Sequence, residues 1–419
     1  MLRHGVGNLA VACGLLLACR LPAFGLGDGL EFRMHFPVKS PDLALVTGGL
    51  PKALALRMRG LQTAEVMLDE PDWWEVSPLQ ICTAGPWGDG GQRLPWFAFV
   101  LDITPYPTLR GWIAPPREMG RRPAESWFRW EDVGGERLQL LEGDDPVLAF
   151  VYGMVLPEGV PAQYRRSCYV HPLYGLDGEV LSDDFPADHL HHRGLFWRWP
   201  HVTVGGQDLD QWACAGAGAR FEGWLAQEGG PVCAVLGARS GWYVEERRIV
   251  EEEAWLRVWT AGKTGRAIDV CLVLAATDEP VGLGGREGKG YGGFGFRYAP
   301  REGPVITAPA GVAAQDSDDQ PLAWADESGR FGGAAQPAGV ALFTDPGNSD
   351  SPNGWCLRHY GYIGVGWPGL GRYTLEPGRP LVLRYRLWVH RGGAEEGQVA
   401  AAYAAFAQPP EVALVGVGD

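Results

Sequence analysis

The sequence predicts an all-β protein: a large antiparallel β-sandwich, of the supersandwich kind, preceded by a small β-rich N-terminal domain. Glycine and proline are abundant, with 61 and 33 copies in 419 residues, which suits many short strands joined by turns. Apolar residues make up 46% of the chain and charged residues 21%, so a packed core is expected. The segment 379–390 alternates apolar residues with Arg384, Arg386 and His390, as a half-buried antiparallel strand does.

Residues 1–25 have the composition of an export signal, with Arg3, an apolar run from Leu9 to Leu17 and small residues after it. Two alternative sites of signal processing fit this segment. The sequence LLAC resembles a lipobox, which would attach a lipid anchor to Cys19, and the sequence AFG at 23–25 resembles an ordinary signal-peptidase site. We therefore expect an exported protein, either a periplasmic or cell-surface lipoprotein or an extracellular protein. No later run of about 20 apolar residues predicts a transmembrane span.

The small N-terminal domain is expected over residues 26–135. Its sequence is irregular and rich in proline and tryptophan, with strand-like segments at 30–38 and 96–106. The stretches between them contain clusters of glycine and proline, which indicate loops.

The main sandwich domain is expected over residues 136–393. A C-terminal segment, 394–419, contains the one convincing helix pattern, at 395–407, followed by a tail. Strands of the sandwich are expected at 146–156, 246–262, 267–277 and 379–390.

Charge and composition indicate which classes of molecule the protein is expected to bind. The net charge is −14 and no basic stripe is visible, so nucleic acid is not an expected partner. The 18 tryptophans can be core residues, or some can stack on sugar rings, and Trp197 is one candidate for stacking. Beyond the export signal, six scattered cysteines leave both disulfides and buried free thiols open.

Histidine is rare in this chain and concentrated in one place. Of nine histidines, five fall between His171 and His201. Three of the five stand in the sequence DDFPADHLHHRG at 183–194, which contains proline, ends at glycine and lies between strand-like runs. We call this segment the histidine loop.

Three roles are open for His189, His191 and His192. They can ligate a metal ion, with Asp188 orienting one ring, since neutral imidazole is the commonest protein ligand. They can act as general acid and base, because the unperturbed pKa of histidine lies near neutral pH. They can also hold the loop through hydrogen bonds to the backbone. A purely structural loop gains little from three titratable rings, so we predict catalytic roles for these histidines, with Asp188 as the first candidate and Asp184 as the second candidate for the carboxylate partner.

Neighbouring residues extend the predicted site. The sequence GLDGEV at 175–180 is typical of a tight hairpin turn, which would bring His171 and Tyr174 beside the histidine loop. Arg193 has five N–H donors in a fixed geometry, so it could clamp an anion or a hydroxyl group.

The block from 169 to 199, YVHPLYGLDGEVLSDDFPADHLHHRGLFWRW, resembles the signature of a bacterial family called PmoA-like. It departs from that signature at Leu190, where proline is usual. Further similar segments lie at 289–298, 339–361 and 377–392, so the resemblance extends over roughly 137–393. The N-terminal hundred residues resemble no family.

The resemblance implies an exported protein of a glycan-degradation system, with a fold similar to galactose mutarotase and related carbohydrate-active enzymes. Proteins of that class often act on a sugar through histidine and arginine beside an acidic residue. On this basis Arg297, Asn348 and Arg358 are expected to bind substrate. Methane oxidation, which the family label suggests, does not follow, because methane oxygenase subunits have several membrane spans.

The function expected is therefore that of an exported carbohydrate-active enzyme, a hydrolase, lyase or epimerase, acting on a sugar or glycan. No cofactor is required, although a metal ion is possible. Two alternatives are open. One is a glycan-binding protein without catalytic activity, and the other is a metal-dependent oxygenase in which His189, His191 and His192 are the ligands.

Overall fold

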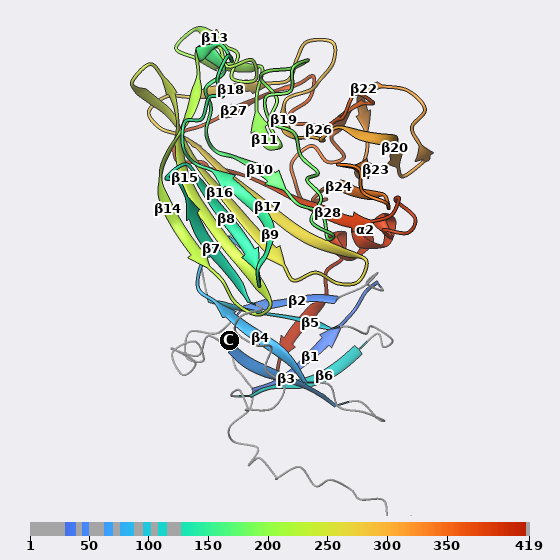
Figure 1. The fold of residues 1–419 in the computed structure, drawn as a ribbon. Coiled ribbons are helices and arrows are strands. Elements are labelled where there is room, and N and C mark those ends of the chain that lie inside the picture. The colour runs from blue at the N-terminus through green and yellow to red at the C-terminus, as the bar shows by residue number, and fades with distance from the viewer. Residues whose placement is uncertain are drawn as a thin grey trace, which may run out of the picture.

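The computed structural model describes residues 30–38, 44–49, 63–69, 76–87, 95–101, 108–114 and 127–415. The predicted export signal, including Cys19, lies outside these residues. Within them the protein is all-β, as predicted, and the described α-helix is α2 (Val399–Ala407) (Figure 1). No helix in the described ranges is long and apolar enough to cross a membrane.

The N-terminal strands form an antiparallel sheet at the base of Figure 1, in the order β2-β5-β4-β3-β6-β1-β29. Its last strand comes from the opposite end of the chain, where the sequence predicted only a tail. The register pairs Phe32 of β1 with Leu414 of β29. The strands are β1 (Leu30–His35), β2 (Ala44–Gly49), β3 (Thr63–Asp69), β4 (Val76–Cys82), β5 (Trp96–Leu101), β6 (Thr108–Ala114) and β29 (Glu411–Leu414).

The first large sheet has nine strands in the order β22-β25-β26-β19-β11-β10-β9-β8-β7 among the described residues. The histidine loop leads into β11, near the centre of this sheet. The strands are β7 (Phe128–Val133), β8 (Arg137–Glu142), β9 (Asp145–Val151), β10 (Tyr169–Leu173), β11 (Leu195–Arg198), β19 (Gly293–Arg297), β22 (Ser317–Pro321), β25 (Gly354–Arg358) and β26 (Tyr362–Gly366).

The second large sheet also has nine described strands, in the order β14-β15-β16-β17-β28-β24-β23-β20-β21. Its central strands are long and pair antiparallel over most of their length. The strands are β14 (Gly218–Glu228), β15 (Cys233–Val244), β16 (Arg247–Trp259), β17 (Gly265–Ala276), β20 (Arg301–Ala308), β21 (Gly311–Val312), β23 (Trp324–Phe331), β24 (Ala338–Thr344) and β28 (Leu381–Arg391).

A smaller sheet covers the upper end of the sandwich in Figure 1, with the order β13-β12-β18-β27. A short 3-10 helix, η3 (Ala162–Tyr164), lies between β9 and β10. The strands of the small sheet are β12 (His201–Val204), β13 (Gln207–Leu209), β18 (Val281–Gly284) and β27 (Arg372–Leu375).

The two large sheets pack face to face around one apolar core, which confirms the predicted sandwich. Side chains from both sheets meet in it, such as Trp197 and Phe294 from the first sheet and Leu256 and Leu383 from the second. Along β28 the buried and partly exposed positions alternate from Leu381 to Leu387, as the sequence predicted, and positions 387–390 are all buried.

His390 is an exception to the alternation on β28. The sequence placed it on a solvated face, but it is only 1% exposed. Its Nε2 atom lies 2.8 Å from Oδ1 of Asp326 on β23, and both side chains are fully covered. The prediction failed because β28 is an internal strand, and the segment that leads into α2 packs over this end of it, where Gly397 lies against the ring.

The N-terminal sheet packs against the outer face of the second large sheet. Cys82 and Trp96 share an apolar cluster with Trp255, Trp259 and Trp388. The side-chain oxygen of Gln80 also accepts hydrogen bonds from the backbone N–H groups of residues 232 and 233, at 3.1 and 3.0 Å. The six described cysteines are free thiols.

One ion pair crosses the core between the two large sheets. Nη1 of Arg198, at the end of β11, lies 3.2 Å from Oε2 of Glu252 on β16, and both side chains are at most 1% exposed. Ser240 and Trp242 donate further hydrogen bonds to the same carboxylate, at 2.8 and 2.7 Å. The buried charge of Arg198 is therefore neutralised from the opposite sheet.

We expect Glu252→Gln to lower the free energy of unfolding by about 3–5 kcal/mol, because it leaves the buried guanidinium of Arg198 without a counter-charge. Urea denaturation of the wild type and the variant measures the difference. The control is Glu251→Gln, since Glu251 is 37% exposed and its arginine partners are at the surface. That change should cost no more than about 1 kcal/mol. Equal effects of the two variants would contradict the interpretation of the buried pair.

Candidate functional site

The histidine loop is an irregular segment formed by successive turns. The N–H of His189 donates to the carbonyl of Pro186 at 3.0 Å, and the N–H of His192 donates to the carbonyl of His189 at 2.8 Å. These turns bring the three imidazole rings together. The loop ends at Gly194, where a side chain would collide with the carbonyl oxygen of Val170.

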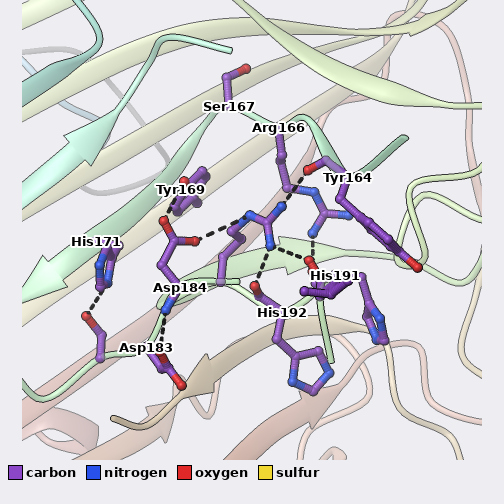
Figure 2. Close-up of polar contacts among 12 residues, drawn as sticks. Tyr164, Arg166, Ser167, Tyr169, His171, Asp183, Asp184, His191 and His192 are labelled. Atoms are coloured by element: carbon purple, nitrogen blue, oxygen red, sulfur yellow. Dashed lines mark hydrogen bonds and ion pairs between the residues drawn. The ribbon is translucent and has the colours of Figure 1, made fainter. Parts of the chain in front are cut away.

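Two buried arginines hold the backbone of the loop (Figure 2). Arg193 donates from Nη1 to the carbonyls of Leu190 and His192, at 2.8 and 2.5 Å, and from Nη2 to that of Tyr164, at 2.6 Å. Arg166 donates from Nη1 to the carbonyl of His191 at 3.0 Å. The sequence predicted that Arg193 clamps substrate, but the structure directs its Nη1 and Nη2 groups to protein carbonyls. We therefore assign it a positioning role.

Asp184 lies on the inner side of the loop. Its Oδ1 atom is 3.5 Å from Nε of Arg193, and its Oδ2 atom accepts a hydrogen bond from the hydroxyl of Tyr169 at 3.0 Å (Figure 2). Burial raises the pKa of Asp184 to about 6, against the opposing effect of Arg193. This carboxyl group is therefore more easily protonated than an exposed aspartate.

His171 also lies beside the loop, as the hairpin turn predicted. Its Nδ1 atom is 3.0 Å from the hydroxyl of Ser182. Burial lowers the pKa of His171 to about 4, so the ring is neutral at pH 7. Tyr174 is half-buried on the same turn and pairs with Val180 through the backbone.

His191 and His192 form the inner part of the histidine cluster. Their rings meet edge to face at 4.6 Å between centroids, and Trp212 and Tyr362 pack against His192. Burial lowers the pKa of His191 to about 4 and that of His192 well below its usual value. Both rings are therefore neutral at pH 7, and Nδ1 of His192 has no hydrogen-bond partner among the described residues.

His189 forms the outer part of the cluster, with 32% of its side chain exposed. Its Nδ1 atom lies 3.0 Å from Oδ2 of Asp188. Both oxygens of that carboxylate accept from Nη2 of Arg297, at 2.8 and 2.9 Å. Burial works to raise the pKa of Asp188, but its hydrogen bonds with Arg297 and His189 outweigh this effect and lower it. Asp188 is thus a carboxylate held between a buried arginine and an accessible imidazole.

Tyr360 covers this group from the adjoining turn between β25 and β26. Its ring is nearly parallel to that of His189, with 4.7 Å between centroids and 16° between planes. The guanidinium carbon of Arg297 lies 4.9 Å from the centre of the same ring. Tyr360 is 41% exposed, and the sequence analysis did not select it. The signal in the sequence for Tyr360 was its position in the segment RHYG, two residues after Arg358, which was predicted to bind substrate.

The other predicted binding residues lie in different surroundings. Trp197 is fully buried in the main core, so it has no surface on which a sugar could stack. Asn348 is buried and bonds the backbone of Arg384 through both its amide nitrogen and its oxygen. Arg358 donates to backbone carbonyls and pairs with Asp318. The side-chain contacts described for these three residues are with other parts of the fold and not with His189.

The alternative that the three histidines bind a metal does not match this arrangement. Among the described residues, no group of three or more His, Cys, Asp or Glu side chains is placed to hold a metal ion. The rings of His189 and His192 are nearly parallel, at 4.7 Å and 15°, and Nδ1 of His189 faces Asp188. The predicted ligand set of His189, His191 and His192 is therefore not formed.

The chain belongs to a protein family of unknown function, DUF6807, whose model matches residues 137–404. That finding gives no support to the resemblance to PmoA-like proteins. No curated protein sequence matches the chain.

Several solved structures have a distantly similar fold. A glycosyl hydrolase family 38 protein from Enterococcus faecalis is 12% identical, with a TM-score of 0.40, over 93% of this chain and 48% of that one. An α-mannosidase from the same organism is 11% identical, with a TM-score of 0.39, over 93% and 46%. This chain thus spans about half the length of each. A GalM/aldose epimerase homologue from C. elegans is 7% identical, with a TM-score of 0.27, over 64% and 99%. These similarities are too weak to identify an activity.

We expect His171 to make the fold sensitive to acid. The unfolded chain binds a proton on this residue near pH 6.5, whereas the folded protein resists protonation until about pH 4. Its contribution is therefore complete above pH 6.5 and is lost as the pH falls toward 4, by an amount on the order of 3 kcal/mol.

The variant His171→Gln tests this, because glutamine can still bond Ser182 but does not titrate. Urea denaturation at pH 7 and at pH 4.5 should show a smaller loss of stability in the variant than in the wild type. Asp184, whose pKa is raised, changes stability in the opposite sense, and it is present in both proteins. Identical pH dependence in the two proteins would contradict the neutral, buried state of His171.

Proposed function

We propose that this member of the DUF6807 family is a carbohydrate-active enzyme in which His189 transfers a proton to or from a sugar. The observation that carries the proposal is the connected group Arg297–Asp188–His189. At one end of this group the side chain of Arg297 is 7% exposed, and at the other end the imidazole of His189 is 32% exposed. A buried cation thus holds a carboxylate, and the carboxylate orients a partly exposed histidine of the cluster.

The chemistry follows from the hydrogen-bonding positions. When Nδ1 of His189 carries the proton, 3.0 Å from Oδ2 of Asp188, the lone pair of Nε2 is left available to accept a proton from a substrate hydroxyl or carbon. The carboxylate then stabilises the imidazolium that forms, and the ring can return the proton in a second step. Arg297 supports this role because it favours the ionised form of Asp188.

His191 and His192 have a different part in the proposal. Both are neutral at pH 7, because burial disfavours their protonated forms. They serve as packing surfaces and neutral hydrogen-bonding groups behind His189 rather than as proton donors. The sequence analysis assigned them catalytic roles, and the geometry favours His189 for the proton transfer.

Proton abstraction and return, as in an epimerase or lyase, fit this site better than hydrolysis of a glycosidic bond. Most glycoside hydrolases use two carboxyl groups on either side of the bond. Here Asp188 is bonded by Arg297, and Asp184 faces Arg193 and Tyr169 on the inner side of the loop. One histidine with one orienting carboxylate suits a reaction in which a single proton moves.

The carbohydrate class of the substrate rests on the resemblance of residues 169–199 to PmoA-like proteins, and the export of the protein rests on the signal-like composition of residues 1–25. Tyr360 adds a partly exposed aromatic ring beside His189, on which the apolar face of a sugar could stack. The sugar and the bond acted on are to be found by incubating the protein with a panel of monosaccharides and polysaccharides. Nuclear magnetic resonance would follow changes in configuration, and ultraviolet absorbance would follow unsaturated products.

On a substrate found in this way, we expect His189→Gln to lower kcat by about 10²- to 10⁴-fold, because the variant cannot carry a proton. Asp188→Asn should lower kcat by a smaller factor, since the ring remains but loses its anionic partner. The matched control is His201→Gln, which removes another histidine paired with an aspartate, Asp208, at 2.7 Å on a different sheet. That variant should retain wild-type kcat.

Two results would overturn the proposal. Full turnover in both His189→Gln and Asp188→Asn, on a substrate that the wild type converts, would remove the proton-transfer role. Calorimetry that shows glycan binding without any product after long incubation would instead favour the non-catalytic glycan-binding alternative.

A further inference from the structure

A cavity lies between η3, the start of β14 and the 211–217 segment that precedes it. Its volume is about 330 Å³, at the lower end of the range of small-molecule sites, roughly 300–1,000 Å³. Four of its lining residues are arginines: Arg165, Arg166, Arg198 and Arg220.

Three buried arginines lie in this region, and they differ in whether a carboxylate lies close to the guanidinium group. Arg198 is paired with Glu252, and Arg193 lies near Asp184. Arg166 is only 5% exposed, and no carboxylate lies within 4.0 Å of it among the described residues. Its partners are the carbonyls of residues 191, 211 and 212 and the thiol of Cys214, whose Sγ is 2.8 Å from Nη2.

None of these partners is a carboxylate, so no aspartate or glutamate among the described residues balances the charge of Arg166. A buried charge without a counter-charge costs several kcal/mol of free energy. Burial lowers the pKa of Arg166 to about 10, an effect that Cys214 opposes and that repulsion from Arg193 and Arg198 increases. An anion bound in the cavity would supply the missing counter-charge.

Gln211 provides a second, independent feature of the cavity. It is 1% exposed and lines the cavity, yet neither Nε2 nor Oε1 has a hydrogen-bond partner among the described residues. Leaving both groups of a buried amide unsatisfied costs free energy, which a ligand with a donor and an acceptor would recover. Hydroxyl groups have both.

We propose that this cavity binds a small hydroxylated oxyanion, a sugar that bears a carboxylate or sulfate group. The anionic group lies near Arg166 and balances its charge, while the Nη1 and Nη2 groups of that arginine keep their protein acceptors. A hydroxyl group of the same ligand bonds the amide of Gln211. Arg165, which is exposed at the same cavity, attracts the ligand electrostatically. This site is separate from the catalytic role proposed for His189 and does not depend on it.

Cys214 gives a direct measurement of occupancy. It lines the cavity and is the one partly exposed cysteine among those described, whereas the thiols at 82, 168, 233, 271 and 356 are buried. The rate at which N-ethylmaleimide labels Cys214 in the full chain can be followed by peptide mass spectrometry. Glucuronate and glucose 6-sulfate should each be tested, with glucose as the neutral analogue and sodium chloride at matched ionic strength as the baseline.

We expect glucuronate or glucose 6-sulfate, at millimolar concentration, to slow the labelling of Cys214, and glucose to leave it unchanged. Protection by only one of the two would identify the anionic group. Equal protection by glucose, or no protection by either anion, would overturn the proposal. Because the readout is a labelling rate and not turnover, failure of the His189 proposal would leave this result unaffected.

Two variants test the assignment without removing Arg166, which also holds the histidine loop. Gln211→Leu removes the amide while keeping a similar volume, and it should weaken ligand affinity roughly tenfold. Arg165→Gln should weaken affinity by a smaller factor that shrinks as salt is added. The matched control is Arg330→Gln, another exposed arginine, on β23 and outside the cavity, which should bind as the wild type does. Wild-type affinity in Gln211→Leu, with its fold verified by circular dichroism, would contradict the site.

Discussion

The site depends on buried guanidinium groups that provide hydrogen-bond donors to an irregular backbone. A loop without strand pairing leaves carbonyl groups that must find partners when they are buried. Arg193 and Arg166 supply those partners by donating to the carbonyls of residues 190, 191 and 192. Each arginine bonds several segments at once, so the positions of the histidines are set from beneath the loop.

This arrangement divides the histidine cluster into two parts. The inner rings, His191 and His192, are packed among aromatic side chains, and burial keeps them neutral. The outer ring, His189, contacts Asp188 and solvent. A residue that transfers protons needs access to its substrate and a partner for its charged form, and His189 has both. The inner rings pack against the ring of His189 and help to fix its position.

The sequence was sufficient to predict the all-β class, the sandwich and the concentration of histidine in one loop, because alternation and composition are local properties. It could not predict which way each loop side chain points. Arg193 faces inward and Tyr360 reaches His189 from a turn distant in the chain. Trp197 lies on a strand packed on both faces, which its neighbours in sequence do not reveal. The pairing of β29 with β1 joins opposite ends of the chain and has no local signal.

The N-terminal sheet and the histidine loop are associated with different large sheets of the sandwich. That sheet packs on the outer face of the second large sheet, through the cluster around Trp255 and Trp388, whereas the histidine loop leads into the first large sheet. The described contacts of the histidine loop are all made by residues 164–362, which lie inside the segment that matches the family. The groups proposed for proton transfer and those lining the cavity beside Arg166 therefore all lie within the segment that matches the family. The described contacts of the N-terminal sheet stabilise the sandwich, because they cover apolar surface of the second large sheet that would otherwise face water.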